Sequence, residues 1–469
     1  MVPPDLRPLF GRAAEHAARF RETLPAGPAR PTLDYHQMRE RSSAPTPETG
    51  TDAQAILDEL AELAEPGLMP TVGPRFFAWV MGASHPAGVA ADMLVSAWGQ
   101  NAGYQSTSPA AAALEEMAER WLLDILDLPA QSGIGFTTGA TVANFTCLAA
   151  ARTSTLQQVG WNADGDGLFG APPVHVLVGA DAHLSVLAAL QQLGFGRKRV
   201  ISVSTDDQGR MLPGALDAAI KPLTGPKVII AQAGQINTGA FDPFVDIVDI
   251  ARTHDAWVHV DGAIGLWARA VPALQHLLAG LEGADSWAGD AHKWLQAPYD
   301  SGLAIVRDRD ALLGAMSQWS SYLPSIAQGD RVPSNYVPEL SRRARGIPVW
   351  ALIRHFGRQG IAEMVERHCG FARRFAQLLA AEPGVRVRND VVLNQVIVNF
   401  GNGDAPARKA ATEAVIARTL ASGTCYVAGA AWRGDWVMRL SVTSGETTEA
   451  DIDLSAAAII EAWRAVQAA

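Results

Sequence analysis

The sequence predicts an α/β fold around a buried, mostly parallel sheet, and three observations carry this prediction. Between about residues 133 and 306, short apolar runs alternate with helical patterns. The runs are rich in β-branched residues and nearly free of polar ones, as expected for parallel strands buried on both faces. Helical segments separate them, which places helices on both sides of the sheet.

Five runs mark the predicted strands, at 174–178, 200–203, 228–231, 257–260 and 303–306. A Gly/Thr-rich turn at 133–141 precedes them and opens a helix over 142–151. Because ligands bind at the carboxyl ends of the strands in such sheets, the residues that follow each run are the first candidates for a site.

The chain is predicted to have three parts: a helical N-terminal segment over 1–75, an α/β domain over 76–349 and a smaller α+β domain over 350–469. In the first part, apolar residues recur at helical spacing over 6–24 and again after Asp52. Such an arm packs either on its own chain or on a neighbouring subunit. In the last part, strand-like runs at 395–400 and 436–442 mix with helices.

Composition excludes several classes of protein. The net charge is -10 over 469 residues without a Lys/Arg cluster, which argues against a nucleic acid or an anionic membrane as partner. No apolar run is long enough to span a bilayer, and no secretory signal is expected at the N-terminus. The three cysteines, Cys147, Cys369 and Cys425, lack metal-like spacing. They predict buried reduced thiols, a cytoplasmic location and no metal site.

Lys293 is the first candidate for chemistry, because it lies between His292 and Trp294 just before an apolar run. Burial lowers the pKa of an ammonium group, and an amine with a lowered pKa forms Schiff bases with aldehydes such as pyridoxal phosphate (PLP). The alternative is a lysine that extends from a loop into water, as most lysines do.

Asp261 and His183 each follow a predicted strand. A carboxylate at Asp261 requires a partner, and a protonated pyridine nitrogen is a fitting one. The alternative is an aspartate that caps the next helix. The imidazole of His183 either stacks on a cofactor ring or is an ordinary core histidine.

The Gly/Thr turn ahead of the helix at 142–151 is a candidate phosphate site. Free backbone N–H groups and the helix dipole favour an anion there, and Thr138 and Thr141 supply hydroxyls. A turn of this kind also caps ordinary helices. The turn has neither GxGxxG nor GK[ST], so neither a dinucleotide fold nor a P-loop is predicted.

The segments 181–183 (Asp-Ala-His), 259–261 (His-Val-Asp) and 290–294 (Asp-Ala-His-Lys-Trp), with Tyr-Asp-Ser-Gly at 299–302, resemble group II PLP-dependent amino-acid decarboxylases. That family comprises the aromatic-L-amino-acid, histidine and glutamate decarboxylases. The resemblance extends from about residue 70 to the C-terminus. It implies the PLP-dependent transferase-like fold (fold type I), PLP as cofactor, and decarboxylation of an L-amino acid to an amine and CO2 through an external aldimine and a quinonoid.

Carried over position by position, the resemblance implies that Lys293 forms the Schiff base, that Asp261 pairs with the pyridine nitrogen and that His183 stacks on the ring. Tyr322 falls where the family has its mobile-loop tyrosine, the candidate proton donor to Cα. The other implied positions bind the cofactor or line the substrate cavity. The cofactor positions are Ala140, Thr141, Asn237, Thr238, Ala263, Asp290 and His292, and the substrate positions are Trp79 and Asn101.

The resemblance also implies a homodimer, with Asn101 reaching the site across the interface. Two departures put the substrate in doubt: Asp290 replaces the usual Asn, and Gly-Ala-Ile-Gly at 262–265 replaces a bulkier run. Gly103 leaves space for a large substrate unless other residues fill it. The aromatic residues, Trp79 among them, favour an aromatic substrate only weakly, because aromatics line most apolar pockets.

Three alternatives stay open. The same fold supports aldehyde-forming oxidative decarboxylation, C–C cleavage and transamination. Family members that form aldehydes tend to have Phe in place of the tyrosine at 322, so Tyr322 favours the amine. Transamination requires a group that retains the carboxylate, and Arg439 is a candidate. A non-catalytic binding protein is disfavoured, because Lys293 and Asp261 are both present.

Overall fold

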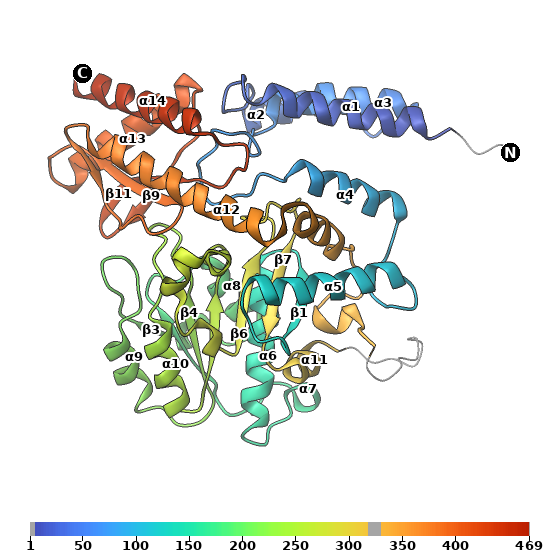
Figure 1. Cartoon of the computed structure of the whole chain (residues 1–469), viewed down its shortest axis with the longest axis vertical. Helices are drawn as coiled ribbons and strands as arrows, with labels where there is room; N and C mark the ends of the chain where they lie inside the picture. Colours follow the sequence, from blue (N-terminus) through green and yellow to red (C-terminus); the bar gives the residue numbers. More distant parts are fainter. Residues whose placement is uncertain (1–4, 318–329, 469) are drawn as a thin grey trace. The chain divides into compact units, whose positions relative to one another are not determined.

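The computed structural model describes residues 5–317 and 330–468, which group into two compact units (Figure 1). Unit 1 comprises residues 1–79, 374–387 and 398–469, and unit 2 comprises residues 80–373 and 388–397, each within the described ranges. The division into parts at 75 and 350 stays a prediction.

Unit 2 contains the large sheet, whose seven strands lie in the order β1-β7-β6-β5-β4-β2-β3. Neighbours from β6 through β3 pair in parallel, whereas β7 is antiparallel to both β6 and β1. The mostly parallel α/β fold is therefore confirmed. The strands are β1 (Gly133–Thr137), β2 (His175–Gly179), β3 (Ile201–Val203), β4 (Lys227–Gln232), β5 (Ala256–Asp261), β6 (Ser286–Asp290) and β7 (Gly302–Val306).

The parallel direction predicted for the run at 303–306 is wrong. This run forms β7, which returns beside β6 after residues 291–301. That connection contains no helix, and a parallel neighbour needs a crossover of about a dozen residues or more. The chain therefore turns back on itself, and the turn carries Lys293.

Helices cover both faces of the large sheet, and two buried clusters show which helices lie on which side. Helices α6 (Ala140–Gln157), α8 (Leu184–Gln192) and α11 (Arg309–Met316) pack on one face, with Leu148 and Trp257 in the core. Helices α5 (Pro109–Ile125), α9 (Pro213–Ile220) and α10 (Phe244–Thr253) pack on the other, with Leu122 and Val258 in the core. Trp257 and Val258 are neighbours on β5 and point to opposite faces, as strand geometry requires.

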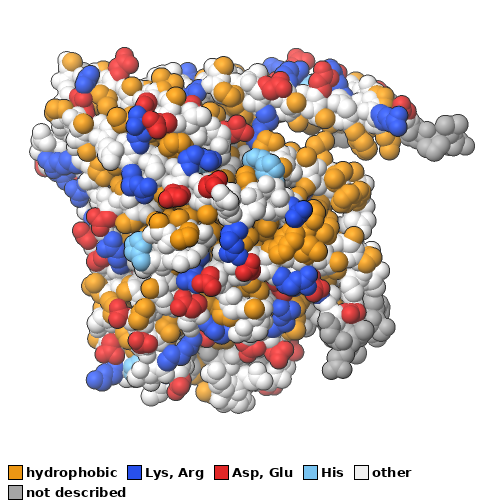
Figure 2. Space-filling model, viewed as in Figure 1, with side chains coloured by type: hydrophobic (Ala, Val, Ile, Leu, Met, Phe, Trp, Pro, Cys, Tyr) orange, Lys and Arg blue, Asp and Glu red, His pale blue; other side chains and the backbone are white. Residues whose placement is uncertain are grey.

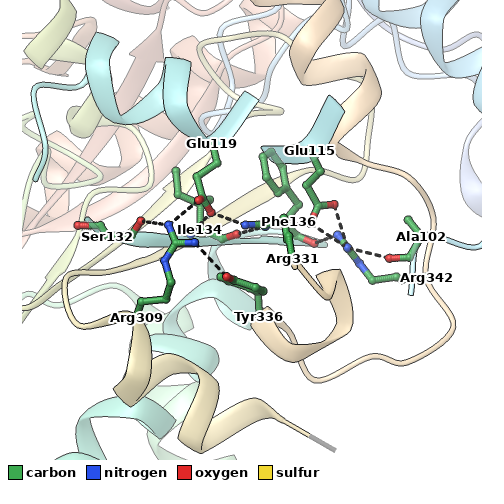
Figure 3. Close-up of polar contacts among 10 residues, drawn as sticks. All are labelled: Ala102, Glu115, Glu119, Ser132, Ile134, Phe136, Arg309, Arg331, Tyr336 and Arg342. Carbon is green, nitrogen blue, oxygen red and sulfur yellow. Dashed lines mark hydrogen bonds and ion pairs between the residues drawn. The ribbon is translucent and has the colours of Figure 1, made fainter. Parts of the chain in front are cut away.

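Strand β1 is an edge of the large sheet, and side chains bind the N–H and carbonyl of Ile134 and the carbonyl of Phe136 on it (Figure 3). The guanidinium of Arg331 donates to the carbonyl of Ile134 at 2.7 Å, and that of Arg342 donates to the carbonyl of Phe136 at 2.9 Å. The carboxylate of Glu119 accepts from the backbone N–H of Ile134 at 2.8 Å. These groups take the place of a further strand and protect the edge from pairing with another chain.

The same guanidinium groups join two buried carboxylates of α5 into one network (Figure 3). Glu119 accepts from Arg331 at 2.5 Å and from Arg309 at 2.7 Å. Glu115 accepts from Arg331 at 3.0 Å and from Arg342 at 2.9 Å. Each buried carboxylate thus faces two cations, which is the pairing that buried charges need.

Unit 1 contains the N-terminal helices and a small sheet of order β10-β11-β9-β8. Helices α1, α2 and α3 have no buried residue. The bounds of the helices are α1 (Arg7–Thr23), α2 (Tyr35–Arg41), α3 (Ala53–Ala64), α13 (Ala405–Ser422) and α14 (Glu449–Gln467). The strands are β8 (Val385–Val387), β9 (Gln395–Phe400), β10 (Ala428–Trp432) and β11 (Asp435–Ser441).

Three further helices complete the described chain: α4 (Pro86–Trp98), α7 (Ala163–Asp166) and α12 (Gly346–Ala380), the last interrupted at the non-helical Gly357. Short 3-10 helices lie at Glu65–Gly67, Arg197–Arg199, Gly265–Ala270, Pro272–Leu278, Leu281–Gly283 and Pro333–Tyr336. None of the helices in the described part combines the length and apolar character needed to cross a bilayer.

On the face drawn in Figure 2, charged side chains of both signs are interspersed, and hydrophobic side chains gather around the place of α4. Helix α4 exposes Met93, Leu94 and Trp98, each by two fifths or more. A cluster of large apolar side chains on one helix is the kind of surface that a protein partner covers.

Candidate active site

Lys293 lies in the turn between β6 and β7, at the carboxyl end of the strands. Its Nζ is 2.9 Å from the Oδ2 atom of Asp290, the last residue of β6, whose side chain is 2% exposed. Only 16% of the Lys293 side chain is exposed. The turn therefore holds a mostly buried lysine amine against one carboxylate.

The Gly/Thr turn meets this lysine at the start of α6. The Oδ1 atom of Asp290 accepts from the backbone N–H of Ala140, the first residue of α6, at 2.6 Å. The backbones of Gly139 and Gly302 approach each other so closely that a Cβ on Gly302 would lie 2.5 Å from the backbone of Gly139. The first turn of α6 leaves further N–H groups, including that of Thr141, without an acceptor inside the helix. An anion-binding helix start thus lies beside Lys293.

Asp261 ends β5 and is 5% exposed. Its carboxylate accepts three long hydrogen bonds, from the N–H of Ala263 at 3.2 Å, from Asn144 Nδ2 at 3.4 Å and from Ser185 Oγ at 3.5 Å. Within residues 5–317 and 330–468, no lysine, arginine or histidine nitrogen lies within 4.0 Å of it. Asp261 is therefore a buried carboxylate to which the described chain supplies no cation.

His183 is the residue before α8 and its imidazole caps that helix. Nδ1 accepts from the backbone N–H of Ser185 at 3.2 Å and lies 2.8 Å from the hydroxyl of the same residue. The ring is half-buried. Because the helix start fixes the imidazole and Ser185 also reaches Asp261, the two predicted ring contacts belong to one hydrogen-bonded group.

His292 is buried beside Lys293, and burial lowers the pKa of its imidazole. Its Nε2 lies 3.7 Å from Asp290, and its ring contacts the ring of Tyr299 at a centroid distance of 4.5 Å. The backbone N–H of Ser301 donates to its Nδ1 at 3.4 Å. These contacts hold the imidazole at the mouth of the turn.

The loop after β4 carries Asn237 and Thr238, both buried. The side-chain oxygen of Gln235 accepts from the backbone N–H of Asn237 at 2.6 Å and from that of Thr238 at 3.0 Å. The hydroxyl of Thr238 donates to the carbonyl of Gln208 at 2.6 Å. Gln235 therefore shapes this loop.

A cavity of about 330 Å³ brings the lysine, the helix start and the capping histidine together. Its lining consists of Thr138, Gly139, Ala140, Thr141, Val142, His183, Ser185, Asp290, His292, Lys293 and Tyr299. Asp261 lies behind it and is joined to the wall through Ser185. Asn237, Thr238 and Ala263 do not line this cavity.

Two predicted substrate positions, Trp79 and Asn101, are not among the residues that line this cavity. Trp79 belongs to unit 1, where its ring contacts those of Phe76 and Tyr426 at 6.1 and 6.0 Å. Asn101 is exposed, and its Oδ1 accepts from the backbone N–H of Arg342 at 3.2 Å. Tyr322 lies outside the described residues.

Sequence reasoning missed Asn144 and Ser185, the two side chains that donate to Asp261. Asn144 is 0% exposed within α6. The signal that could have found it is a lone amide inside the apolar helix pattern at 142–151, because a buried amide requires partners.

Of the two alternatives for Gly103, the structure supports the one in which other residues fill the space. A Cβ at this position would lie 2.6 Å from the carbonyl oxygen of Leu340. Backbone from a distant part of the chain fills the space, so the glycine is required by close packing.

The residues of the site fit PLP. The cofactor carries an anionic phosphate, an aldehyde and a ring nitrogen that can hold a positive charge. The start of α6 suits the anion, the amine of Lys293 suits the aldehyde, and the carboxylate of Asp261 has no cation of its own in the described chain. The carboxylate of Asp261 is the feature that points most specifically to PLP, because a buried carboxylate without a cation is costly and the ring nitrogen can supply that cation.

Comparison with known proteins agrees with this fit. Residues 36–400 match the family described as the pyridoxal-dependent decarboxylase conserved domain. An aromatic-L-amino-acid decarboxylase of Bacillus atrophaeus is 29% identical over 81% of this chain and 81% of its own length. Tryptophan decarboxylase 1 of Oryza sativa subsp. japonica is 27% identical over 94% of this chain and 90% of its own length.

A 4-hydroxyphenylacetaldehyde synthase of Rhodiola rosea is 26% identical over 96% of this chain and 91% of its own length. Among solved structures, the Oryza sativa TDC with PLP and tryptamine matches with a TM-score of 0.92 and 24% identity, covering 99% of both chains. At this identity the structural match shows the fold.

The fold, the site and these matches define a PLP-dependent enzyme. More narrowly, the chain belongs to the pyridoxal-dependent decarboxylase family. It is a carboxy-lyase that uses PLP to decarboxylate an amino acid.

Proposed function

We propose that the substrate is an aromatic L-amino acid, that Lys293 holds the cofactor and that Asp261 holds a proton on the cofactor ring nitrogen. The observation that carries these roles is the buried carboxylate of Asp261, which lies behind the lysine cavity without a cationic partner in the described chain. A carboxylate so placed needs a cation, and a protonated ring nitrogen supplies one.

Each side chain then has a defined task. PLP, when bound, supplies an aldehyde and an electron-accepting ring. Lys293 binds the aldehyde through Nζ, and Asp290 orients that amine through the 2.9 Å contact. The start of α6 and His292 bind the phosphate, while His183 covers the ring. Asp261 holds the proton at the ring nitrogen, which keeps the ring able to accept the electrons of the broken Cα–carboxylate bond.

The aromatic substrate is supported by the names of the relatives. They include aromatic-L-amino-acid, tryptophan and tyrosine decarboxylases, and they cover four fifths or more of this chain. A lyase specific for an aromatic side chain selects it by apolar contact in its cavity. Trp79 and Asn101 stay predicted substrate contacts by resemblance.

The amine is the proposed product. Tyr322 is proposed to protonate Cα after CO2 leaves, because the resemblance places it at the family's loop tyrosine. An aldehyde is the second candidate, since relatives of similar identity include the 4-hydroxyphenylacetaldehyde synthase and a phenylacetaldehyde synthase. Mass spectrometry distinguishes the amine from the aldehyde.

A homodimer is proposed as the working assembly. Helices α1 and α3 contact each other yet bury no residue, and they expose Phe10, Ile56 and Leu60 by 45% or more. Helix α4 exposes Leu94 by 49%. A second copy of the chain would cover such apolar surfaces. A cytoplasmic location is proposed because Cys147, Cys369 and Cys425 are free and buried.

The assembly is tested by light scattering on the eluting protein. Leu94→Glu is expected to shift the mass toward one chain, because it buries a charge at the proposed contact. Leu454→Glu is the matched control, since Leu454 on α14 is 52% exposed and is expected to leave the mass unchanged. A wild-type mass of one chain would overturn the dimer.

The activity is tested by incubating the PLP-loaded protein with tryptophan, tyrosine, phenylalanine and dihydroxyphenylalanine, and with glutamate and ornithine for comparison. CO2, amine, aldehyde and hydrogen peroxide are followed together. We expect equal CO2 and amine from an aromatic substrate. Turnover confined to glutamate or ornithine would overturn the substrate class, and aldehyde with peroxide would overturn the product.

The role of the lysine is tested with Lys293→Ala. Turnover and the visible absorbance of the lysine–PLP Schiff base are both expected to disappear. Lys198→Ala is the control, because Lys198 is exposed and lies in the 3-10 helix at Arg197–Arg199. Normal absorbance in the Lys293 variant would refute the assignment.

A further inference from the structure

A row of polar side chains follows one face of β5 behind the cofactor cavity. Trp257, His259 and Asp261 alternate along the strand, so all three point to the face that α6 covers. They are 7%, 0% and 5% exposed. Asn144 of α6, at 0% exposed, lies against the same face.

From Trp257 to Asp261, the contacts form one continuous chain of hydrogen bonds. Trp257 Nε1 lies 2.9 Å from Ser286 Oγ, and Ser286 Oγ lies 2.9 Å from His259 Nδ1. His259 Nε2 lies 2.8 Å from Asn144 Oδ1, and Asn144 Nδ2 lies 3.4 Å from Asp261 Oδ2. Ser286 is the first residue of β6 and pairs with His259 across the sheet.

The two ends of this relay fix its direction. The indole N–H of Trp257 only donates, and the carboxylate of Asp261 only accepts. The NH2 group of Asn144 therefore faces Asp261, and its amide oxygen accepts from the Nε2–H group of His259. A neutral imidazole with its proton on Nε2 accepts at Nδ1, so the hydroxyl of Ser286 donates to Nδ1 and accepts from Trp257. Every donor in the relay points toward the carboxylate.

The members of the relay that precede Asp261 carry no net charge. Burial lowers the pKa of His259 to about 3, so its imidazole is neutral at physiological pH. The amide of Asn144 separates it from Asp261 and cannot ionise. Asp261 thus receives oriented dipoles rather than a cation, and its negative charge is left for a ligand.

The relay also reaches His183. Asn144 Nδ2 lies 3.4 Å from Ser185 Oγ, which in turn lies 2.8 Å from Nδ1 of His183. One amide therefore contacts the groups that orient both the ring-nitrogen carboxylate and the capping imidazole.

We propose that His259 and Asn144 are positioning residues, which aim the Asp261 carboxylate at the cofactor ring nitrogen and hold its charge unpaired until the cofactor binds. This inference rests on the proposed role of Asp261. A salt bridge within the protein would orient Asp261 equally well but would neutralise it, whereas a neutral relay orients it and leaves the attraction for the protonated ring nitrogen intact.

The test is the protonation of the ring nitrogen, measured as the 15N chemical shift of ring-labelled PLP bound to the protein. Asn144→Leu removes the amide at nearly constant volume. We expect the signal to move from the protonated toward the unprotonated position, and PLP to bind about tenfold more weakly because a hydrogen bond to a charged group is lost. We expect kcat to fall with KM little changed, because the ring accepts electrons only during the reaction.

His259→Leu and His259→Gln form a second pair of variants. Leu breaks the relay and is expected to move the 15N signal in the same direction as Asn144→Leu. Gln retains a donor toward Asn144 and an acceptor toward Ser286, so it is expected to restore the signal. Thr146→Val is the control for packing, because Thr146 is 0% exposed on α6 and its hydroxyl has no hydrogen-bond partner among the described residues.

The outcomes separate the two hypotheses. Asp261→Asn serves as the reference, and an unchanged 15N signal in that variant refutes the proposed role of Asp261 itself. A signal that moves in Asp261→Asn but stays in place in Asn144→Leu and His259→Leu refutes the relay alone. A fall in thermal stability without a change in the signal assigns these residues a structural role and equally overturns the proposal. If Asn144→Leu does not fold, the His259 pair decides.

Discussion

Replacing Glu119 of α5 by Gln is expected to destabilise the chain far more than replacing Glu116 of the same helix by Gln. Glu119 is 2% exposed and accepts from Arg331, Arg309 and the N–H of Ile134. The amide keeps the shape of the side chain but loses its charge and turns one oxygen into a donor. Two guanidinium groups then lose an anion, and Arg331 keeps only Glu115.

The magnitude follows from burial. Breaking a buried ion pair by removing one partner costs about 3–5 kcal/mol, because the remaining charge stays uncompensated. Glu116 on the same helix pairs with Arg120, and their side chains are 47% and 62% exposed. An exposed i,i+4 pair contributes only about 0.3–0.5 kcal/mol, so Glu116→Gln is the matched control.

Urea unfolding of the cofactor-free protein measures both variants against wild type. We expect the free energy of unfolding to fall by several kcal/mol for Glu119→Gln and to change by less than about 1 kcal/mol for Glu116→Gln. Equal losses in the two variants would refute the reasoning that the network holds the edge of β1.

Three further predictions concern the site. Asp290→Asn is expected to tighten the binding of inorganic phosphate to the cofactor-free protein several-fold, because the carboxylate bonded to the N–H of Ala140 repels an anion at the start of α6; calorimetric titration showing equal or weaker binding would contradict this. Tyr322→Phe is expected to spare CO2 release but divert product from amine to aldehyde, and an unchanged amine yield by mass would remove its proposed role. His259 has a folded pKa below its unfolded value, so the unfolded state binds more protons between about pH 6.5 and 3 and stability falls as the pH falls through that window. His259→Gln is expected to reduce this slope by up to ~1.4 kcal/mol per pH unit, and parallel curves of stability against pH would count against it.

The sequence predicted the strands that are rich in β-branched residues and missed those that are not. The runs that form β2, β4 and β5 were recognisable because strands buried on both faces read as continuous apolar segments. Strands β1 (Gly-Ile-Gly-Phe-Thr) and β6 (Ser-Trp-Ala-Gly-Asp) carry glycines and polar residues. Their pairing with β7 makes them strands, and that tertiary context is not readable from local propensity.

The site divides in a similar way. Lys293, Asp261 and His183 were predictable because each lies where a strand ends, the place where ligands bind in such sheets. Asn144 and Ser185 lie within helices, and their importance depends on which strand residue faces them. In the sequence, Trp257 and His259 are ordinary strand positions. Their role depends on the helix α6, which covers the face of β5 to which they point.

Two buried acidic sites in unit 2, the pair Glu115 and Glu119 and the single Asp261, have opposite electrostatics, and this contrast separates structure from function. At β1, Glu115 and Glu119 face three arginines, so their charges are neutralised within the protein. At β5, the donors that Asp261 receives from the described residues are all neutral. A sequence shows both sets merely as acidic residues in apolar surroundings. The difference lies in the partners: a carboxylate that the fold has neutralised stabilises the fold, whereas one that the fold orients but leaves charged is available to a ligand.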